Sequence, residues 1–355
     1  MAGFRDCHAE HWSFDIQHQL NEKTLITAGY FGSKGTHLIG AFELNELPPG
    51  LALKTQCVAL GNDTQTLQTP GVATVPCQPA NTAFLSSGNS NILDQIRPFR
   101  GYRSITMIQP RFNSNYNSLQ ISVQRRFSGS SQINGAYTWA KNLTDNQTDR
   151  STAPENSYDI SLDRGRATLD RRHVATVNYI YELPWYTSQQ GFVGKALGGW
   201  QASGIVTLNT GLPFTVTTSN YDAAGLGNNP AAVAGNRPNV LCDPNANAPQ
   251  TRLQYFNIGC FQANPAANPT NLPNTPGNSP RGIVNGPPTK RVDFTMTKIL
   301  AVSEGFRIQL RGEAFNIFNH TNFRALSTNV TATNFGQVTT VRDPRTVQLG
   351  IKLLF

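Results

Sequence analysis

The chain has 355 residues, of which 14% are charged, and a formal net charge of +8 with 30 Gly and 22 Pro. No continuous apolar run approaches the ~20 residues that a membrane-spanning helix needs, so the composition excludes a helical membrane protein. The basic residues are scattered and lack the patterns of nucleic-acid-binding domains, so we expect no nucleic acid among the partners.

Apolar and polar residues alternate at a period of two in several blocks, which predicts β-strands because successive strand side chains point to opposite faces. In chain order, the predicted strands cover residues 12–20, 24–30, 119–124, 133–139, 175–183, 200–208, 292–297, 308–314 and 347–355. Short and long connections between them alternate along the chain. The long ones cover residues 32–116, 142–171 and 219–290.

This asymmetry of connections is typical of transmembrane β-barrels, which have short periplasmic turns and long extracellular loops. Loops above ~15 residues are uncommon in compact soluble domains, so they count against a β-sandwich. Aromatic residues near the predicted strand ends favour interfacial girdles. They are Trp12, Tyr137, Trp139, Trp185, Tyr186 and Trp200. Ordinary strand propensity explains part of that enrichment.

The longest predicted loop, residues 219–290, is dense in Asn, Pro, Ala and Gly. Such a composition buries little apolar surface, so we expect this segment not to order itself without help.

The cysteines fall into two predicted external loops. Cys57 and Cys77 lie in one loop, and Cys242 and Cys260 lie in the other, so each pair could form a disulfide in an oxidising compartment. Free or differently paired thiols are the alternative, and Cys7 is left over. No Cys-x-x-Cys pair occurs, so a zinc site lacks its usual signature.

Arginines are concentrated in and beside the long loops. Arg97, Arg100, Arg103, Arg164, Arg166, Arg171 and Arg172 form the densest group. Because guanidinium groups bind phosphate bidentately, we predict that Arg97, Arg100, Arg103, Arg164 and Arg166 contact lipopolysaccharide or an anionic ligand. The alternative is a solvated loop base in which arginines pair with Asp163 and Asp170.

Motifs of enzymes and cofactor sites are missing from the sequence. There is no Gly-x-Ser-x-Gly elbow and no Gly-x-Gly-x-x-Gly fingerprint. The segment from His8 to His11 has the wrong spacing for a metalloprotease. We therefore expect neither an enzyme nor a bound cofactor or metal.

The last predicted strand places Val347, Leu349, Ile351, Leu353 and Phe355 on one face, which could contact lipid. A terminal phenylalanine after alternating apolar residues resembles the signal read by the barrel-assembly machinery. The alternative is that Phe355 is only a lipid-facing residue. On the preceding strand, Arg311 and Glu313 are expected on the opposite, lumenal face.

Five stretches together resemble the barrel of the Oar-like TonB-dependent outer-membrane transporters. They are Tyr30–Leu38, Asn115–Phe127, Gly135–Lys141, Arg311–Phe323 and Phe335–Phe355. The resemblance implies an all-β fold, an antiparallel barrel of about 22 strands with a plug in its lumen. It also implies ligand uptake across the bacterial outer membrane, driven by the TonB complex, with outer-membrane lipid and lipopolysaccharide as surroundings.

About nine strands are too few for such a barrel, and lipid cannot satisfy an open sheet edge. We therefore expect residues 1–355 to be one partial barrel domain, the C-terminal portion of a longer barrel, without plug or N-terminal domains. The start of the chain has no apolar secretory segment, which favours the same interpretation. We expect the chain alone neither to insert nor to transport. A structural or adhesive outer-membrane protein without import and a soluble carbohydrate-binding β protein are the rival hypotheses.

Overall fold

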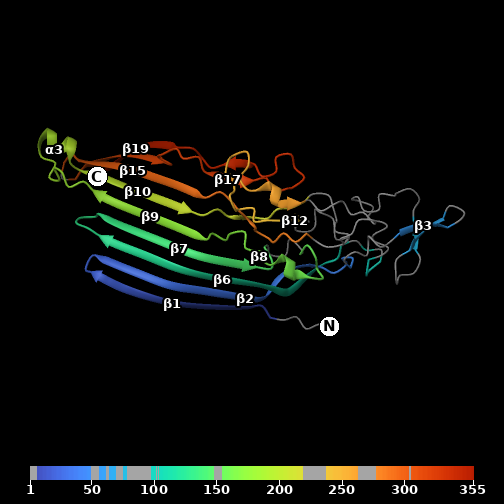
Figure 1. Cartoon of the computed structure of the whole chain (residues 1–355). Helices are drawn as coiled ribbons and strands as arrows, with labels where there is room; N and C mark the ends of the chain where they lie inside the picture. The colour runs from blue at the N-terminus through green and yellow to red at the C-terminus, as the bar shows by residue number, and fades with distance from the viewer. Residues whose placement is uncertain are drawn as a thin grey trace.

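The computed structural model describes residues 6–48, 97–100, 102, 104–147, 154–218, 237–262, 277–303 and 305–355, and the backbone alone of residues 56–60, 64–68 and 75–77. The largest element of the described chain is one antiparallel sheet of ten strands. Nine of these strands lie side by side in chain order (Figure 1). They are β1 (His8–Asn21), β2 (Thr24–Glu43), β6 (Thr106–Arg126), β7 (Gln132–Thr144), β9 (His173–Glu182), β10 (Trp200–Asn209), β15 (Thr289–Ala301), β16 (Arg307–Phe315) and β19 (Thr346–Leu354).

The tenth strand, β8 (Gly165–Arg166), extends the sheet beside the end of β7. All nine strands that the sequence predicts are present, and several are longer than predicted. The largest difference concerns residues 32–116, where β2 continues to Glu43 and pairs with β6 from Thr106 onward. The prediction of a loop over this whole stretch is therefore wrong at both ends.

A bulge explains the missed strand ends. The register between β2 and β6 shifts between Gly35 and Leu38, and His37 has a left-handed φ of 54°. A bulge inserts an extra residue into one strand, so the side-chain alternation changes phase at that point. The alternation of apolar and polar residues is therefore interrupted at the bulge, although the strand continues beyond it.

The sheet has one apolar and one polar face, because directly paired residues on neighbouring strands point to the same side. One apolar row crosses six strands through Ile16, Ala28, Ile121, Tyr137, Ala175 and Leu208. A second apolar row consists of Tyr179, Gly204, Phe294, Ala314 and Val347. The residues between these rows are mostly polar, for example Gln120, Thr138, Ser203, Thr295 and Glu313.

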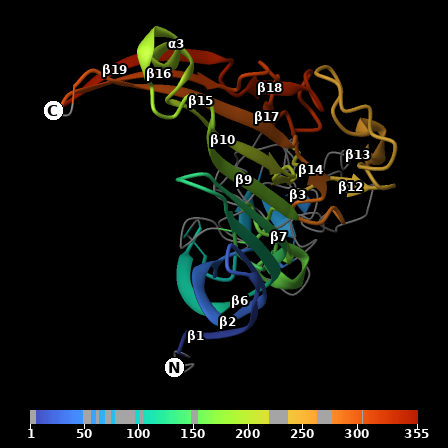
Figure 2. The same cartoon turned by 90° about the vertical axis from the view of Figure 1, so that its left-hand side faces the viewer.

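Seen along the strands, the sheet is an open arc with β1 and β19 at its two ends (Figure 2). In the part of the chain that the structure describes, neither of these edge strands has a second neighbour in the sheet. Nine strands thus curve as a segment of a wall without closing into a ring. No described helix has the length and apolar composition that a membrane span requires.

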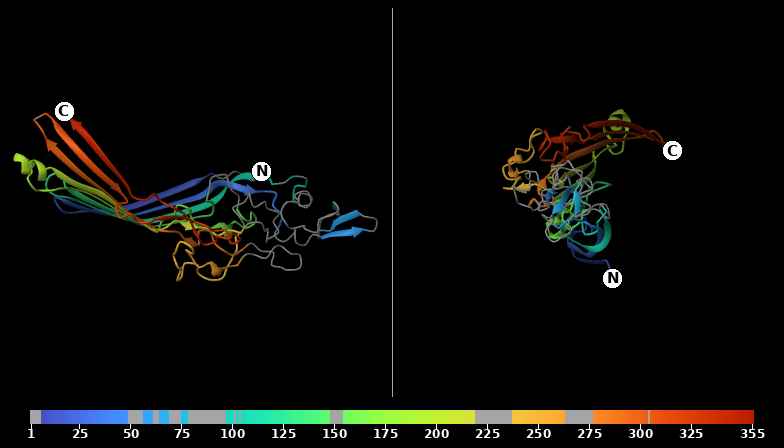
Figure 3. Two further views of the ribbon diagram at one scale, coloured as in Figure 1. Left: turned by 90° about the horizontal axis from the view of Figure 1, so that it is seen from above. Right: turned by 90° about the vertical axis from the view of Figure 1, so that its right-hand side faces the viewer.

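The connections differ between the two ends of the sheet (Figures 1 and 3). Tight turns join β1 to β2, β6 to β7 and β15 to β16 at the end where the C-terminus lies. The link from β9 to β10 is also at this end and contains a short helix, α3 (Gly191–Leu197). Every long connection leaves from the opposite end, which we call the loop end.

The loop end contains small sheets of its own. These are β3–β4–β5 (Gln56–Leu60, Thr64–Gln68, Val75–Cys77), β11 (Pro213–Phe214) with β14 (Val284–Asn285), β12 (Asn239–Val240) with β13 (Phe261–Gln262), and β17 (Phe323–Leu326) with β18 (Val338–Val341). Two 3-10 helices, η1 (Ile160–Asp163) and η2 (Ile258–Cys260), complete the described elements.

An apolar core lies among these loops. Its buried members are Val216, Tyr255, Phe256, Cys260, Phe261, Val284 and Leu326. Phe256 packs edge-to-face against Phe261 and Phe335. We call this packed layer the cap. The described residues 237–262 and 277–288 of the long predicted loop are ordered with the help that the composition requires, because Val216, Leu326 and Phe335 from neighbouring loops complete their core.

Candidate ligand-contact site at the loop end

The polar face of the sheet carries charged and amide side chains that can hydrogen-bond to a solute. Arg311 and Glu313 lie on this face, as the sequence predicts, and form an ion pair of 2.6 Å with each other. Nearer the loop end, Arg291 bonds Asp293 at 2.7 Å and lies over the ring of Phe315, 5.8 Å from its centroid. The wall can therefore hold polar or charged groups in contact with water.

An asparagine-rich turn follows β16 and fixes the loop end of three strands. Asn322 is buried and behaves like a strand residue: its side chain accepts a hydrogen bond from the Lys290 N–H (2.7 Å) and donates one to the Lys290 carbonyl (2.9 Å). Asn316, with a left-handed φ of 52°, similarly bonds the N–H and the carbonyl of His320, each at 3.0 Å. Asn319 accepts from the Arg345 N–H just before β19.

A polar cavity of about 110 Å³ lies between this turn and the β17–β18 hairpin. Its lining residues are Arg291, Asn316, Asn322, Arg324, Val341, Arg342 and Asp343. Within the described residues, no carboxylate forms an ion pair with Arg324 or Arg342, and Arg291 pairs only with Asp293. The cavity therefore has an excess of positive charge. We call it the arginine pocket.

A further basic group lies beside this pocket. The guanidinium of Arg171 donates to the Thr210 carbonyl (2.7 Å), and its pKa is below the usual value because of burial and, second, the positive charge of Arg342. An anion placed among these guanidiniums would relieve that repulsion and gain charge-assisted hydrogen bonds.

Sequence reasoning did not single out the pocket arginines. Arg291, Arg324 and Arg342 are 33 and 18 residues apart in succession, in β15, in β17 and directly after β18. The one available signal was that Arg324 directly follows, and Arg342 lies within, the stretches that carry the family resemblance.

The arginines predicted from the sequence are placed differently. Arg97 is buried and donates to the Asn45 carbonyl at 2.7 Å. Arg164 bonds Asp145 (2.7 Å), and Arg166 bonds Asp170 (2.8 Å) and Asn285 (2.6 Å). Arg100 is exposed, and Arg103 lies outside the described residues. Of these arginines, the four that the structure describes do not line the arginine pocket, and the contact of all five with lipopolysaccharide or ligand stays a prediction.

Asp163 organises a buried ionic cluster in the cap. It accepts hydrogen bonds from the side chains of Arg237 (2.9 Å) and Arg281 and from the Glu155 N–H (2.9 Å). Arg237 also pairs with Glu155 at 2.7 Å. The sequence analysis considered Asp163 as a partner of nearby arginines, whereas its partners are 74 and 118 residues away.

Burial controls the ionisation of this cluster. Loss of water around Glu155 raises the pKa of its carboxyl to about 7, and the charge of Arg237 only partly opposes that rise. The cluster ties two long connections together, because Glu155 and Asp163 lie between β7 and β9, whereas Arg237 and Arg281 lie between β10 and β15.

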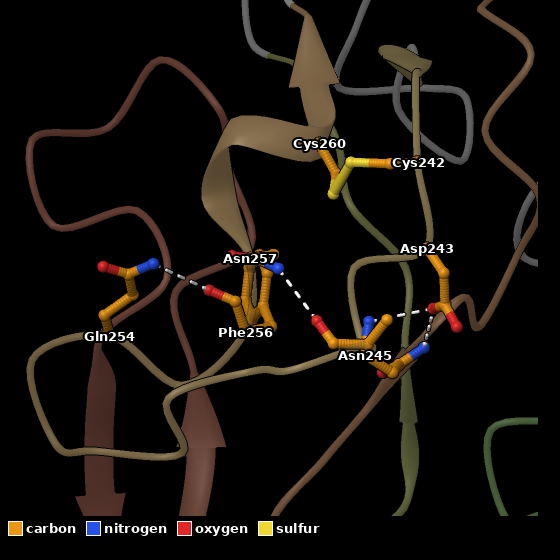
Figure 4. Close-up of a disulfide and its surroundings, with 8 residues drawn as sticks. Cys242, Asp243, Asn245, Gln254, Phe256, Asn257 and Cys260 are labelled. Atoms are coloured by element: carbon orange, nitrogen blue, oxygen red, sulfur yellow. Dashed lines mark hydrogen bonds between the residues drawn. A yellow bond between two sulfur atoms is a disulfide. The ribbon is translucent and has the colours of Figure 1, made fainter.

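Cys242 and Cys260 form a disulfide with a Cα–Cα distance of 5.0 Å (Figure 4). It stands beside the β12–β13 pair, where the Leu241 N–H donates to the Cys260 carbonyl. The neighbouring turn is fixed by Asn257, whose amide donates to the Ala246 carbonyl at 2.9 Å. The side chains of Cys57 and Cys77 lie outside the described residues, and Cys7 is an exposed free cysteine.

The closing strand lies at the edge of the sheet, paired only with β16 among the described strands. Val347, Leu349, Ile351 and Leu353 stand opposite Ala314, Gly312, Leu310 and Ile308 and share their apolar face. Phe355 follows the last paired residue and is exposed. Whether the barrel-assembly machinery reads this end stays a prediction.

No cluster of metal-ligating side chains occurs among the described residues. His8 and Glu10, which the sequence analysis considered, lie on β1 and form an exposed ion pair of 3.3 Å with each other.

Among comparisons with known proteins, a family model and a solved structure match the chain. Nothing among the curated proteins matches the chain. Among solved structures, the chain is similar to the outer membrane transporter YddB from Escherichia coli, with 8% identity and a TM-score of 0.46. That match covers 99% of this chain and 33% of the transporter, so the chain spans about one third of its length. The model of the outer membrane beta barrel domain family matches residues 2–348. The chain therefore belongs to the outer membrane β-barrel domain family, whose place is the bacterial outer membrane and whose members are typically not enzymes.

Proposed function

We propose that the chain forms the C-terminal part of the barrel of a TonB-dependent transporter of the Oar-like kind. The carrying observation is that nine neighbouring strands form an open arc with one apolar face and one mostly polar face. Small barrels of ~8 strands fill their interior with side chains, whereas much wider barrels enclose a lumen that can hold a plug. An arc this open fits the wider class. Lipid cannot satisfy the free edges of β1 and β19, so further strands must complete the ring.

We further propose that the imported ligand carries negative charge and contacts the arginine pocket on its way into the lumen. Arg291 projects from the polar face of β15, whereas Arg324 and Arg342 come from the β17–β18 hairpin in the loops. The pocket thus joins the outer loops to the lumen wall, which is where a ligand would pass. Guanidinium groups suit carboxylates and phosphates because their planar donors match both oxygens of the anion.

The first experiment measures coupling to TonB. The complete outer-membrane polypeptide that carries this chain is purified in detergent, and its binding to the periplasmic domain of TonB is measured by calorimetry. The proposal expects saturable binding. A completed barrel that does not bind TonB would favour the alternative, a structural or adhesive outer-membrane protein without import.

The second experiment tests the pocket with citrate as a simple polyanionic probe. Arg324→Gln combined with Arg342→Gln should weaken citrate binding by about thirtyfold, because each of the two lost charge-assisted hydrogen bonds contributes on the order of 1 kcal/mol. The matched control is Arg307→Gln at the opposite end of the sheet. Equal affinity for citrate in the pocket variant and in the control would contradict the proposal that the ligand contacts the arginine pocket.

A further inference from the structure

The helix-containing link between β9 and β10 has an apolar surface that the transport proposal does not use. Trp185, Tyr186, Phe192, Val193 and Leu197 are all exposed there, and Phe192 reaches 88%. The α3 helix lies at the end of the sheet with the tight turns, opposite the cap (Figure 1). In transmembrane barrels the end with short turns faces the periplasm.

Lys298 fixes α3 to the outside of the wall. In the sheet Lys298 stands between Trp200 and Leu310, and the row continues to Ile351, so its side chain leaves from the apolar face. Its ammonium group donates to the carbonyls of Lys195 (2.6 Å), Ala196 (3.0 Å) and Gly198 at the C-terminal end of α3. A cation is favourable at a helix C-terminus, where the last carbonyls lack intrahelical partners.

Two other contacts hold the link in the same place. The indole N–H of Trp200 donates to the Ala196 carbonyl at 3.1 Å. The side chain of Gln189 donates to the Ile299 carbonyl (2.9 Å) and accepts from the Ala301 N–H (3.1 Å). These contacts hold the C-terminal end of α3 against the wall, while Phe192, Val193 and Leu197 stay exposed.

We propose that α3 and the preceding Trp185 and Tyr186 form a membrane-interface anchor that lies in the periplasmic leaflet of the outer membrane. Its occupant is phospholipid, because the surface continues the lipid-facing side of the sheet through Trp200 and Lys298. The composition also fits: tryptophan and tyrosine are favoured at the headgroup level, and the exposed Lys195 can reach anionic headgroups beside Phe192 and Leu197.

The test places a fluorophore on the anchor. In a background with Cys7, Cys57 and Cys77 replaced by serine and the Cys242–Cys260 disulfide retained, Phe192→Cys is labelled with an environment-sensitive dye. The complete polypeptide is folded into vesicles of phosphatidylethanolamine and phosphatidylglycerol. Lipids that carry a nitroxide near the headgroup, or deep in the acyl chain, then quench the dye according to its depth.

The proposal expects headgroup-level nitroxide to quench the dye at position 192 at least about twofold more than the deep nitroxide, since interfacial helices lie ~5–10 Å into the headgroup boundary. Ile351→Cys, on the lipid-facing wall, should show lipid quenching as well, and Leu253→Cys, exposed in the cap, should show none. Val193→Cys is a second anchor position if Phe192→Cys folds poorly. Quenching at both anchor positions as weak as at Leu253 would overturn the proposal and indicate water or a protein partner on this surface. The result is independent of TonB binding.

Discussion

The strand wall and the cap use apolar side chains in opposite ways. In the wall, Leu349 and Ile351 leave most of their surface uncovered by protein, at 82% and 74% exposure. In the cap, Phe256 and Val216 are almost completely buried, at 1% and 0%. The wall is therefore stabilised by the surrounding lipid hydrocarbon and by the backbone hydrogen bonds between its neighbouring strands. The cap is instead stabilised by the burial of apolar side chains away from water, as a water-soluble domain is.

The difference extends to charges. The wall pair of Arg311 and Glu313 is partly exposed to the lumen, and such pairs contribute little because water competes for both groups. In the cap, Arg237, Asp163 and Glu155 are removed from water and depend on one another. Substitutions and pH should therefore affect the two regions separately.

The largest effect is expected from Arg237→Ala in the cap. The substitution leaves the carboxylates of Glu155 and Asp163 buried with less compensation, which should lower the free energy of unfolding of the cap by about 3–5 kcal/mol. Limited trypsin digestion across a urea series measures cap opening, and the heat-dependent gel shift of the folded barrel reports on the wall. Arg311→Ala is the wall control and should cost about 0–1 kcal/mol. A simultaneous loss of wall and cap stability would show that the two regions do not unfold separately.

An arginine on the lipid-facing side of the wall should have the next largest effect. Val177→Arg, in the middle of β9, should lower the stability of the inserted barrel by about 2–4 kcal/mol, because the charge meets hydrocarbon. Asn178→Arg is the matched control: it is the next residue, points to the polar face and faces Asn134 and Ile205. Urea titration of the complete protein in phospholipid vesicles measures both. If Asn178→Arg were the more damaging change, the two faces would be assigned the wrong way round.

A smaller effect is expected from pH. The pKa of Glu155 is raised from 4.5 to about 7 in the folded cap, so the folded state binds its proton more tightly than the unfolded chain. This contribution to stability is complete below pH 4.5 and is lost as the pH rises through about 7. From pH 5 to pH 8 the free energy of unfolding of the cap should fall by about 1–3 kcal/mol.

Glu155→Gln supplies the control for the pH experiment, because an amide does not titrate. Its cap should show a nearly flat profile in the same trypsin assay. The wall should not follow the Glu155 titration in either protein. A cap that becomes more stable between pH 5 and pH 8 would contradict the assigned direction of the pKa shift.

The sequence predicted the wall well and the cap poorly, for reasons visible in particular residues. Alternation over residues 347–355 requires only neighbours in the chain, and β19 forms with its apolar residues on one face as predicted. The bulge at His37 hid the extensions of β2 and β6, because one inserted residue changes the phase of the pattern. The arginine pocket has no local signal, since its guanidiniums come from β15 and from the distant β17–β18 hairpin and the residue after it.

What the sequence determined by itself was the set of strands, their two faces and the alternation of short and long connections, because each is a property of consecutive residues. Long-range contacts were needed to bury Phe256 in a core, to pair Arg237 with Asp163 across 74 residues, and to fix α3 to the apolar face of the wall through Lys298. These contacts depend on which distant segments the sheet register brings together. Register arises from the pairing of whole strands, so no single stretch of sequence contains it.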